Sequence, residues 1–172
     1  MKWVVGTGRC GLHNYTALND GFIEATDKFK ECGHKKFHGD PYDEDHVRSV
    51  IRDRMKRKAG CITDCGQFMF IDIIAEEDPD AEFIWIIRDK DACVESFMNR
   101  PNEDKRIHPK GWDFAHKNKM KLIIWYYDTV NETIEKLLEG KKFTKIRTED
   151  MEKVVDSRGF LLEGKTSNWD RH

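Results

Sequence analysis

Short apolar runs alternate along the chain with longer segments in which apolar residues recur at helical spacing. Apolar runs at residues 2–6, 61–65, 81–89 and 142–147 are typical of strands, and the run at 81–89 is nearly unbroken, as in a strand buried on both faces. This alternation is the pattern of a parallel sheet covered by helices. The sequence therefore predicts one α/β domain over residues 1–172, a three-layer structure with a parallel sheet flanked by helices.

Helices are expected between and after these strands. They are predicted at residues 11–18, 45–58, 68–78, 91–100 and 112–138, with a short last helix at 148–155 that opens on a capping-box pattern. Residues 32–45 contain Gly39 and Pro41, and we expect a short strand or loop there. The tail from Gly159 onward is expected to be irregular.

The net charge of the chain says little about its binding partners, because 30 Lys and Arg residues nearly balance 32 Asp and Glu residues. Two local runs, at residues 52–58 and 116–121, are basic. Either they attract an anion to a cleft between them, or they are solvated faces of helices.

The five cysteines are odd in number and show no paired framework, so we expect reduced thiols and a cytoplasmic location. The cysteines and histidines between residues 32 and 65 lack the spacing of a zinc site, and no metal is expected. The first apolar run is too short for a signal peptide or an anchor, and no other run is long enough to span a bilayer. We therefore expect no membrane insertion.

The first candidate site is the glycine-rich stretch after the strand at 2–6. A strand, a glycine turn and the start of a helix together aim backbone N–H groups at one point, which favours an anion. Gly6, Gly8 and Gly11 match the GxGxxG fingerprint of dinucleotide-binding proteins. That fingerprint also needs an acidic residue at the end of a second strand, and the sequence has no convincing candidate.

The same stretch has part of the pattern GxxxxGK[ST], the nucleotide-binding P-loop. Gly6 and Gly11 have the required spacing, but Leu12 and His13 replace the lysine and the hydroxyl residue. Binding of a nucleoside triphosphate with magnesium is therefore not expected. What remains is a phosphate-binding loop with its positive charge at Arg9, or a tight turn with a surface arginine.

The second candidate site follows the strand at 82–87. This strand ends in Arg88, and Ser96 follows eight residues later in the next helix. Open parallel sheets bind ligands at the carboxyl ends of their strands, and a guanidinium group can hold a phosphate through two parallel hydrogen bonds. We expect the strand ends at Gly6 and Arg88 to converge, so that both anionic groups of one nucleotide bind at once.

In order and spacing, four regions resemble the sulfotransferase family, whose members transfer a sulfuryl group from 3′-phosphoadenosine 5′-phosphosulfate (PAPS). The stretch GTGRCGLHNY resembles the family's 5′-phosphosulfate loop, which implies that the cofactor contacts Gly8, Arg9, Cys10, Gly11, Leu12 and His13. FIWIIRDKDACVESF is similar to the 3′-phosphate motif and implies contacts for Arg88 and Ser96. FTKIRTEDM resembles the strand that ends in an acidic box, and GKTSNWD the loop that closes over the cofactor, which implicates Lys165 and Trp169.

The resemblance implies a P-loop NTPase-like sulfotransferase architecture, with departures. Leu12 and His13 stand where the family has serine or threonine, so backbone amides, His13 or Asn14 must supply that contact to the 5′-phosphate. Lys90 replaces the proline that usually follows the Arg-Asp pair. The chain is also shorter than most members, which trims the region that binds the acceptor.

The resemblance further implies in-line transfer to a hydroxyl acceptor, with Arg9 as the cation at the leaving oxygens. The acceptor needs a general base. Asp64 is the first candidate because it follows the strand where the family places its base, although it equally suits a helix cap. His34 and His38 are second candidates. The expected acceptor is a small-molecule or glycan hydroxyl, and no nucleic-acid polymer is expected as a partner.

Two other functions stay open: a Rossmann-type dinucleotide-binding enzyme, and a non-catalytic nucleotide-binding protein with the sulfotransferase fold. Aromatic residues of the helix expected at 112–138 could line an acceptor pocket. Trp112, Trp125, Tyr126 and Tyr127 have a spacing more typical of a core, so they are left out of the predicted site.

Overall fold

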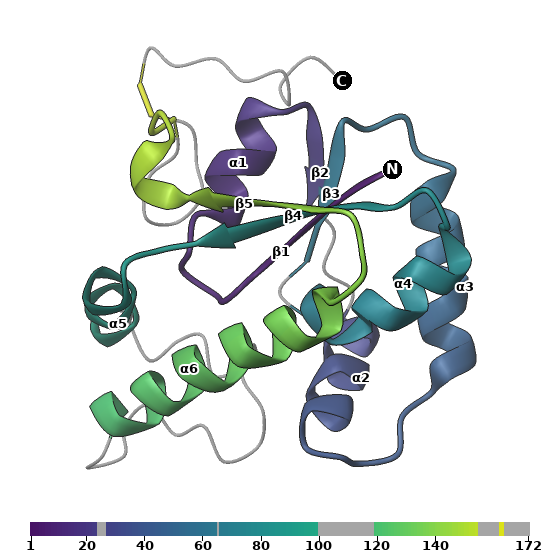
Figure 1. Ribbon diagram of the computed structural model, residues 1–172, viewed down its shortest axis with the longest axis horizontal. Coiled ribbons are helices and arrows are strands. Elements are labelled where there is room, and N and C mark those ends of the chain that lie inside the picture. Colours follow the sequence, from purple (N-terminus) through teal and green to yellow (C-terminus); the bar gives the residue numbers. More distant parts are fainter. Residues whose placement is uncertain (24–26, 65, 100–118, 155–161, 164–172) are drawn as a thin grey trace.

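The computed structural model describes residues 1–23, 27–64, 66–99, 119–154 and 162–163 (Figure 1). Its described strands form one five-stranded sheet in the order β2-β3-β1-β4-β5, with every pairing parallel. The strands are β1 (Lys2–Gly6), β2 (Gly21–Ile23), β3 (Cys61–Thr63), β4 (Glu82–Ile87) and β5 (Phe143–Arg147). The predicted α/β fold with a parallel sheet is confirmed.

Helices connect these strands. They are α1 (Leu12–Leu18), α2 (Asp27–Phe37), α3 (Glu44–Met55), α4 (Ile71–Glu77), α5 (Lys90–Met98) and α6 (Lys119–Leu138), with short 3₁₀ helices η1 (Gln67–Phe70) and η3 (Thr148–Asp150). Within the described ranges, no helix combines the length and the apolar character that crossing a membrane requires.

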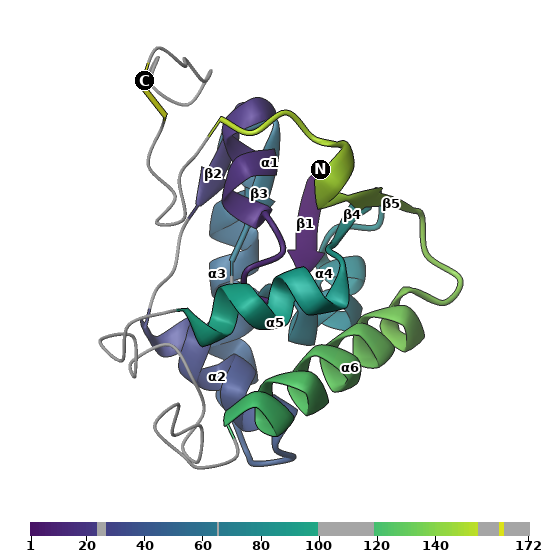
Figure 2. The same cartoon turned by 90° about the vertical axis from the view of Figure 1, so that its left-hand side faces the viewer.

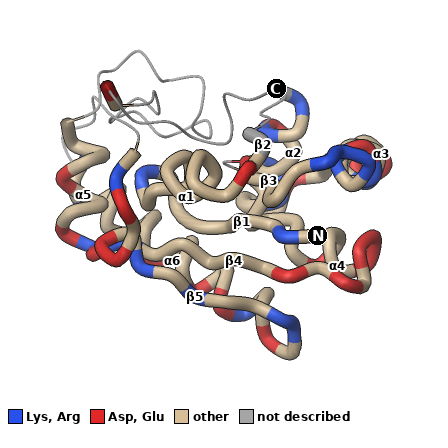
Figure 3. Tube along the Cα trace, turned by 90° about the horizontal axis from the view of Figure 1, so that it is seen from above, with Lys and Arg blue, Asp and Glu red and all other residues tan. Residues whose placement is uncertain are grey.

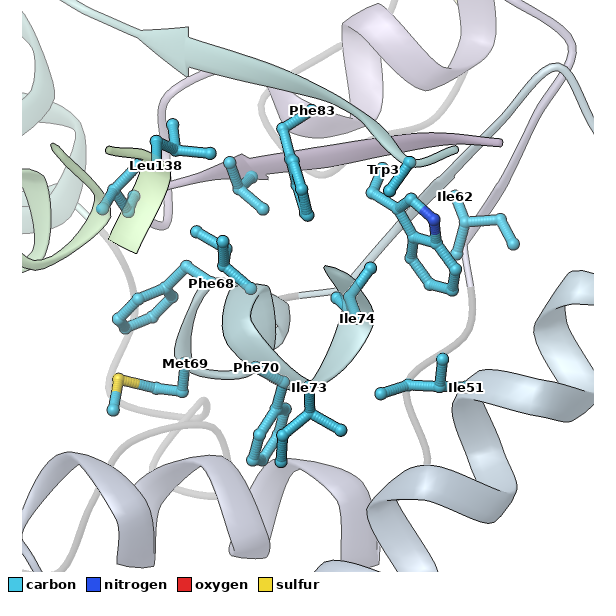
Figure 4. Packing of buried hydrophobic residues seen from close by; sticks show 14 of the residues in the cluster. Trp3, Ile51, Ile62, Phe68, Met69, Phe70, Ile73, Ile74, Phe83 and Leu138 are labelled. Atoms are coloured by element: carbon cyan, nitrogen blue, oxygen red, sulfur yellow. The ribbon is translucent and has the colours of Figure 1, made fainter. Parts of the chain in front are cut away.

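The helices lie on both faces of the sheet, which gives the three predicted layers. Side chains of a strand alternate between its faces, so Trp3 and Val5 of β1 pack against α2, α3, α4 and α6, whereas Val4 packs with α1 on the other face. Figure 4 shows the larger cluster, where Trp3 and Phe83 of the sheet lie above α4. Helix α5 packs on α6 across the end toward which β1 points (Figure 2).

The prediction for residues 32–45 was wrong over residues 32–37, which lie in helix α2, and at its end, where α3 begins; residues 38–43, with Gly39 and Pro41, form the predicted loop. Phe29 and Cys32 are buried at helical spacing, and Phe29 packs on Phe70 with ring centroids 4.9 Å apart. Gly33 does not break the helix. It lets α2 come close to the loop after β3, since a Cβ at this position would lie 3.3 Å from the Cα of Gly66.

Two further elements differ from the prediction. Strand β2 was missed because it has only three residues, which are too few to show a period. The helix predicted at 148–155 is only the 3₁₀ turn η3 over its described part. The backbone after it bonds elsewhere: the Asn14 side chain donates to Glu152 O at 2.6 Å and accepts from Val154 N at 2.8 Å.

The basic run at 52–58 is largely engaged in ion pairs. Arg52 binds Glu77 of α4 at 2.6 Å, and Lys56 binds Asp53 at 2.8 Å. Figure 3 shows blue and red segments mixed along α3. Arg54 points into the protein and is fully buried. Of the second run, Lys119 donates to Met98 O at 3.0 Å, and residues 116–118 lie outside the described residues.

Candidate functional site

The two predicted strand ends lie side by side. Strands β1 and β4 are paired in register from Lys2 with Glu82 to Gly6 with Ile86. They approach so closely at the end that a Cβ on Gly6 would lie 2.5 Å from the Ile86 carbonyl oxygen. The loop after Gly6 and the turn at Arg88 therefore leave the same edge of the sheet together, which confirms the expected convergence.

The loop after β1 has a conformation that few side chains adopt. Arg9 has φ 64° and Gly11 has φ 90°, and a non-glycine residue in this left-handed region is uncommon and stores strain, often at functional sites. Helix α5 supports the loop, because the Cys93 thiol donates to Gly8 O at 3.6 Å. A Cβ on Gly8 would lie 3.1 Å from the Phe97 ring.

Hydrogen bonds connect the two predicted cation sites. The Arg9 Nε donates to Ser96 Oγ at 3.1 Å, and the Arg88 Nη1 donates to the main-chain carbonyl of Arg9 at 3.1 Å. Both bonds end on neutral oxygen atoms, so neither removes the positive charge. Two guanidinium groups at one edge of the sheet create a field that attracts anions.

Side chains from the second half of the chain hold the backbone around Arg88. Thr148 Oγ1 lies 3.1 Å from Ile87 O, Tyr127 donates its hydroxyl to Arg88 O at 2.6 Å, and Glu149 Oε1 accepts the Asp89 N–H at 3.0 Å. Burial raises the pKa of Tyr127 to about 12, so it remains a neutral donor near neutral pH. None of these three residues was predicted from the sequence to support the site.

The hydrogen bond of Glu149 is expected to weaken in acid. Its acceptance of the Asp89 N–H holds the pKa of the Glu149 carboxyl below the ordinary value of 4.5. A lowered pKa stabilises the folded protein above the ordinary value, and this contribution is lost as the pH falls through the lowered one. The free energies of urea unfolding of the wild type and of Glu149→Gln are expected to differ at neutral pH and to converge as the pH falls below 4.5. A difference that persists in acid would contradict this role.

Asp64 lies at the end of β3, as predicted, but inside the protein. Its Oδ2 binds Arg54 Nη2 at 2.9 Å and its Oδ1 accepts the Gly66 N–H at 3.1 Å. Neither the Asp64 nor the Arg54 side chain is exposed. Burial raises the pKa of the Asp64 carboxyl, and Arg54 opposes that rise. Both carboxylate oxygens are thus engaged within the protein.

The two histidine candidates belong to α2 and its end. His34 is half-buried and follows Gly33, where α2 contacts the loop after β3. His38 follows the helix and is exposed.

The remaining loop residues differ in what they can offer. Leu12 is 6% exposed and packs with Val4 and Ile84, so its side chain belongs to the core and only its backbone can face a ligand. The Cys10 side chain is also buried. His13 is half-buried in the first turn of α1. Lys165 and Trp169 lie outside the described residues.

The described part of the chain contains no cluster of side chains that could act as metal ligands. Within it, no three His, Cys, Asp or Glu side chains lie together in a way that could hold an ion.

An all-parallel α/β sheet with a glycine-rich loop and two arginines at adjacent strand ends defines a class of proteins that bind anionic ligands at the carboxyl edge of the sheet. Comparison with protein families narrows this class. The model of the sulfotransferase domain matches residues 8–158, which include Arg9, Arg88 and Ser96. The chain therefore belongs to the sulfotransferase domain family. A search of the curated proteins finds no match.

Proposed function

We propose that this protein is a PAPS-dependent sulfotransferase that acts on a hydroxyl group of a small molecule or glycan. The observation that carries the proposal is the hydrogen-bonded link of Ser96, Arg9 and Arg88 across the adjacent ends of β1 and β4. PAPS has anionic groups on both the 3′ and the 5′ oxygen of one ribose. Arg9 and Arg88, which hydrogen bonds hold close together, can each bind one of these two anionic groups.

The two ends of the nucleotide are assigned to the two sites. Arg88 and Ser96 bind the 3′-phosphate, and the glycine-rich loop with Arg9 binds the 5′-phosphosulfate. The loop contacts are assigned to Gly8, Cys10, Gly11, Leu12 and His13, with Leu12 contributing its backbone. Lys165 remains a proposed contact from the C-terminal segment.

PAPS, when bound, supplies a sulfuryl group on a phosphate leaving group. The positive charge of Arg9 stabilises the negative charge that develops on the leaving side, and this effect is large in a site that excludes water. The base that takes the acceptor's proton is assigned to His34, because histidine is the residue type that most often acts as a general base. Asp64 is a weaker candidate because both of its oxygens are engaged.

Calorimetry with adenosine 3′,5′-bisphosphate tests this proposal. Arg88→Ala is expected to weaken binding by at least about 100-fold, since hydrogen bonds to charged groups contribute about 1.5–3 kcal/mol each. Arg52→Ala is the matched control, because Arg52 pairs with Glu77 on α3 and α4 and its loss should leave binding unchanged. Unchanged affinity in the Arg88 variant would count against the assignment.

The strand order argues against the dinucleotide-binding alternative. In that fold the second strand lies beside the first, and an acidic residue at its end binds the ribose. Here β3 lies between β1 and β2, so the end of β2 is two strands away from the glycine-rich loop. Binding of NAD in place of adenosine 3′,5′-bisphosphate would reverse this conclusion.

One observation favours a second candidate function, nucleotide binding without transfer. Leu12 packs into the core at a position where the resemblance implies a hydroxyl residue, so the loop has one polar side chain fewer. Tight binding of adenosine 3′,5′-bisphosphate combined with no release of it from PAPS, with or without acceptors, would support this candidate.

A further inference from the structure

The hydroxyl of Thr148 lies between the two loops of the candidate site. Its Oγ1 donates to the Cys10 carbonyl of the glycine-rich loop and lies 3.1 Å from the Ile87 carbonyl, which precedes Arg88. A threonine hydroxyl has a single proton, so the two carbonyl groups share it in a three-centre hydrogen bond. One atom therefore contacts the backbone of both loops.

The methyl group of Thr148 contacts the same loop. A Cβ on Gly11 would lie 2.9 Å from Cγ2 of Thr148, which shows how closely the two residues pack. Gly11 has a φ of 90°, so its backbone also needs glycine. Thr148 is half-buried, which limits competition from water for its hydroxyl.

The position of Thr148 depends on β5. This strand pairs with β4 from Phe83 with Phe143 to Ile87 with Arg147, so the residue after β5 arrives at the carboxyl edge beside Arg88. The next residue, Glu149, accepts the Asp89 N–H and so contacts the turn after β4. Thr148 contacts both this turn and the glycine-rich loop.

We propose that Thr148 is a positioning residue that sets the spacing between the glycine-rich loop and the turn at Arg88. This inference rests on the proposed function, in which one nucleotide binds both loops. When one ligand binds two sites, the second contact gains from the effective concentration that the geometry provides. A looser spacing reduces that gain for a ligand with two phosphates. It changes little for a ligand that uses one site only.

The test compares three nucleotides by calorimetry: adenosine 3′,5′-bisphosphate, adenosine 5′-monophosphate and adenosine 3′-monophosphate. Thr148→Val keeps the shape and removes the hydroxyl. It is expected to bind the bisphosphate about tenfold more weakly, whereas each monophosphate changes by less than about threefold. Thr148→Ser keeps the hydroxyl and is expected to restore most of the bisphosphate affinity. Should Thr148→Val fail to fold, Thr148→Ala carries the same prediction.

Thr144→Val is the matched control, because Thr144 is exposed on β5, the strand that leads to Thr148, and the substitution is chemically identical. It is expected to leave all three affinities unchanged. Two results would overturn the inference alone: unchanged bisphosphate affinity in Thr148→Val, or an equal loss for all three nucleotides. A wild-type protein that binds none of the three would overturn the proposed function, and this inference with it.

Discussion

Arg9→Ala is expected to lower turnover about 100- to 1,000-fold and the affinity for adenosine 3′,5′-bisphosphate much less, by about tenfold, because Arg9 is one of several contacts to the 5′ group. Turnover and affinity are expected to change by different amounts because the substitution removes the side chain of Arg9 and leaves its main chain. Arg88 binds the carbonyl oxygen of Arg9, which every substitution at this position retains. Arg88 therefore keeps its support, whereas the charge at the leaving side and the bond from Arg9 to Ser96 are lost.

Turnover can be measured before the acceptor is known, as the slow release of adenosine 3′,5′-bisphosphate from PAPS in water. Arg9→Lys keeps a positive charge but loses the fixed bond from Nε to Ser96, so it is expected to fall between the wild type and Arg9→Ala. Ser96→Ala removes the hydroxyl that accepts this hydrogen bond. Equal losses of affinity and turnover in Arg9→Ala would instead make Arg9 a residue of nucleotide binding alone.

Asp64→Asn is expected to lower the free energy of unfolding by about 3–5 kcal/mol, because it leaves the buried charge of Arg54 without its counter-ion. Arg54 cannot turn out to water easily. Its guanidinium lies over the Phe29 ring, 4.2 Å from the centroid, and its Nη1 donates to Gln67 at 3.3 Å. Urea denaturation at neutral pH measures the change.

Asp53→Asn is the matched control, since Asp53 forms an exposed pair with Lys56 on the same helix and should leave the unfolding free energy unchanged within error. The double variant Arg54→Met with Asp64→Leu removes both charges and is expected to recover most of the stability. A stable Asp64→Asn protein without turnover would reverse the assignment and make Asp64 the general base.

The sequence predicted best those elements whose pattern lies within one continuous segment. The unbroken apolar run of β4 and the long periodic helix α6 appear in the structure close to where they were predicted. The convergence of the strand ends at Gly6 and Arg88 also follows from local reasoning, because parallel strands put their carboxyl ends at one edge. Short elements such as β2 offer too few residues for a period to show.

Contacts between distant segments explain what the sequence did not predict. Tyr127 and Thr148 reach the backbone beside Arg88 from 39 and 61 residues away, and only the pairing of β4 with β5 and the packing of α6 make those bonds visible. One signal was available for the buried ion pair. Arg54 lies on the same helical face as Val47 and Ile51, which are both buried, so its side chain had to point inward as well.

The position of β1 in the sheet has a consequence for how the protein is made. β1 is the central strand, yet it is the first to leave the ribosome, and its neighbours β3 and β4 begin only at Cys61 and Glu82. Until then the nascent chain carries the apolar side chains of Trp3, Val4 and Val5 with no partner strand from this sheet. Such distant pairing is slow and leaves unfinished chains prone to aggregate. We therefore expect unfinished chains, rather than the folded protein, to be the form that is most prone to aggregate.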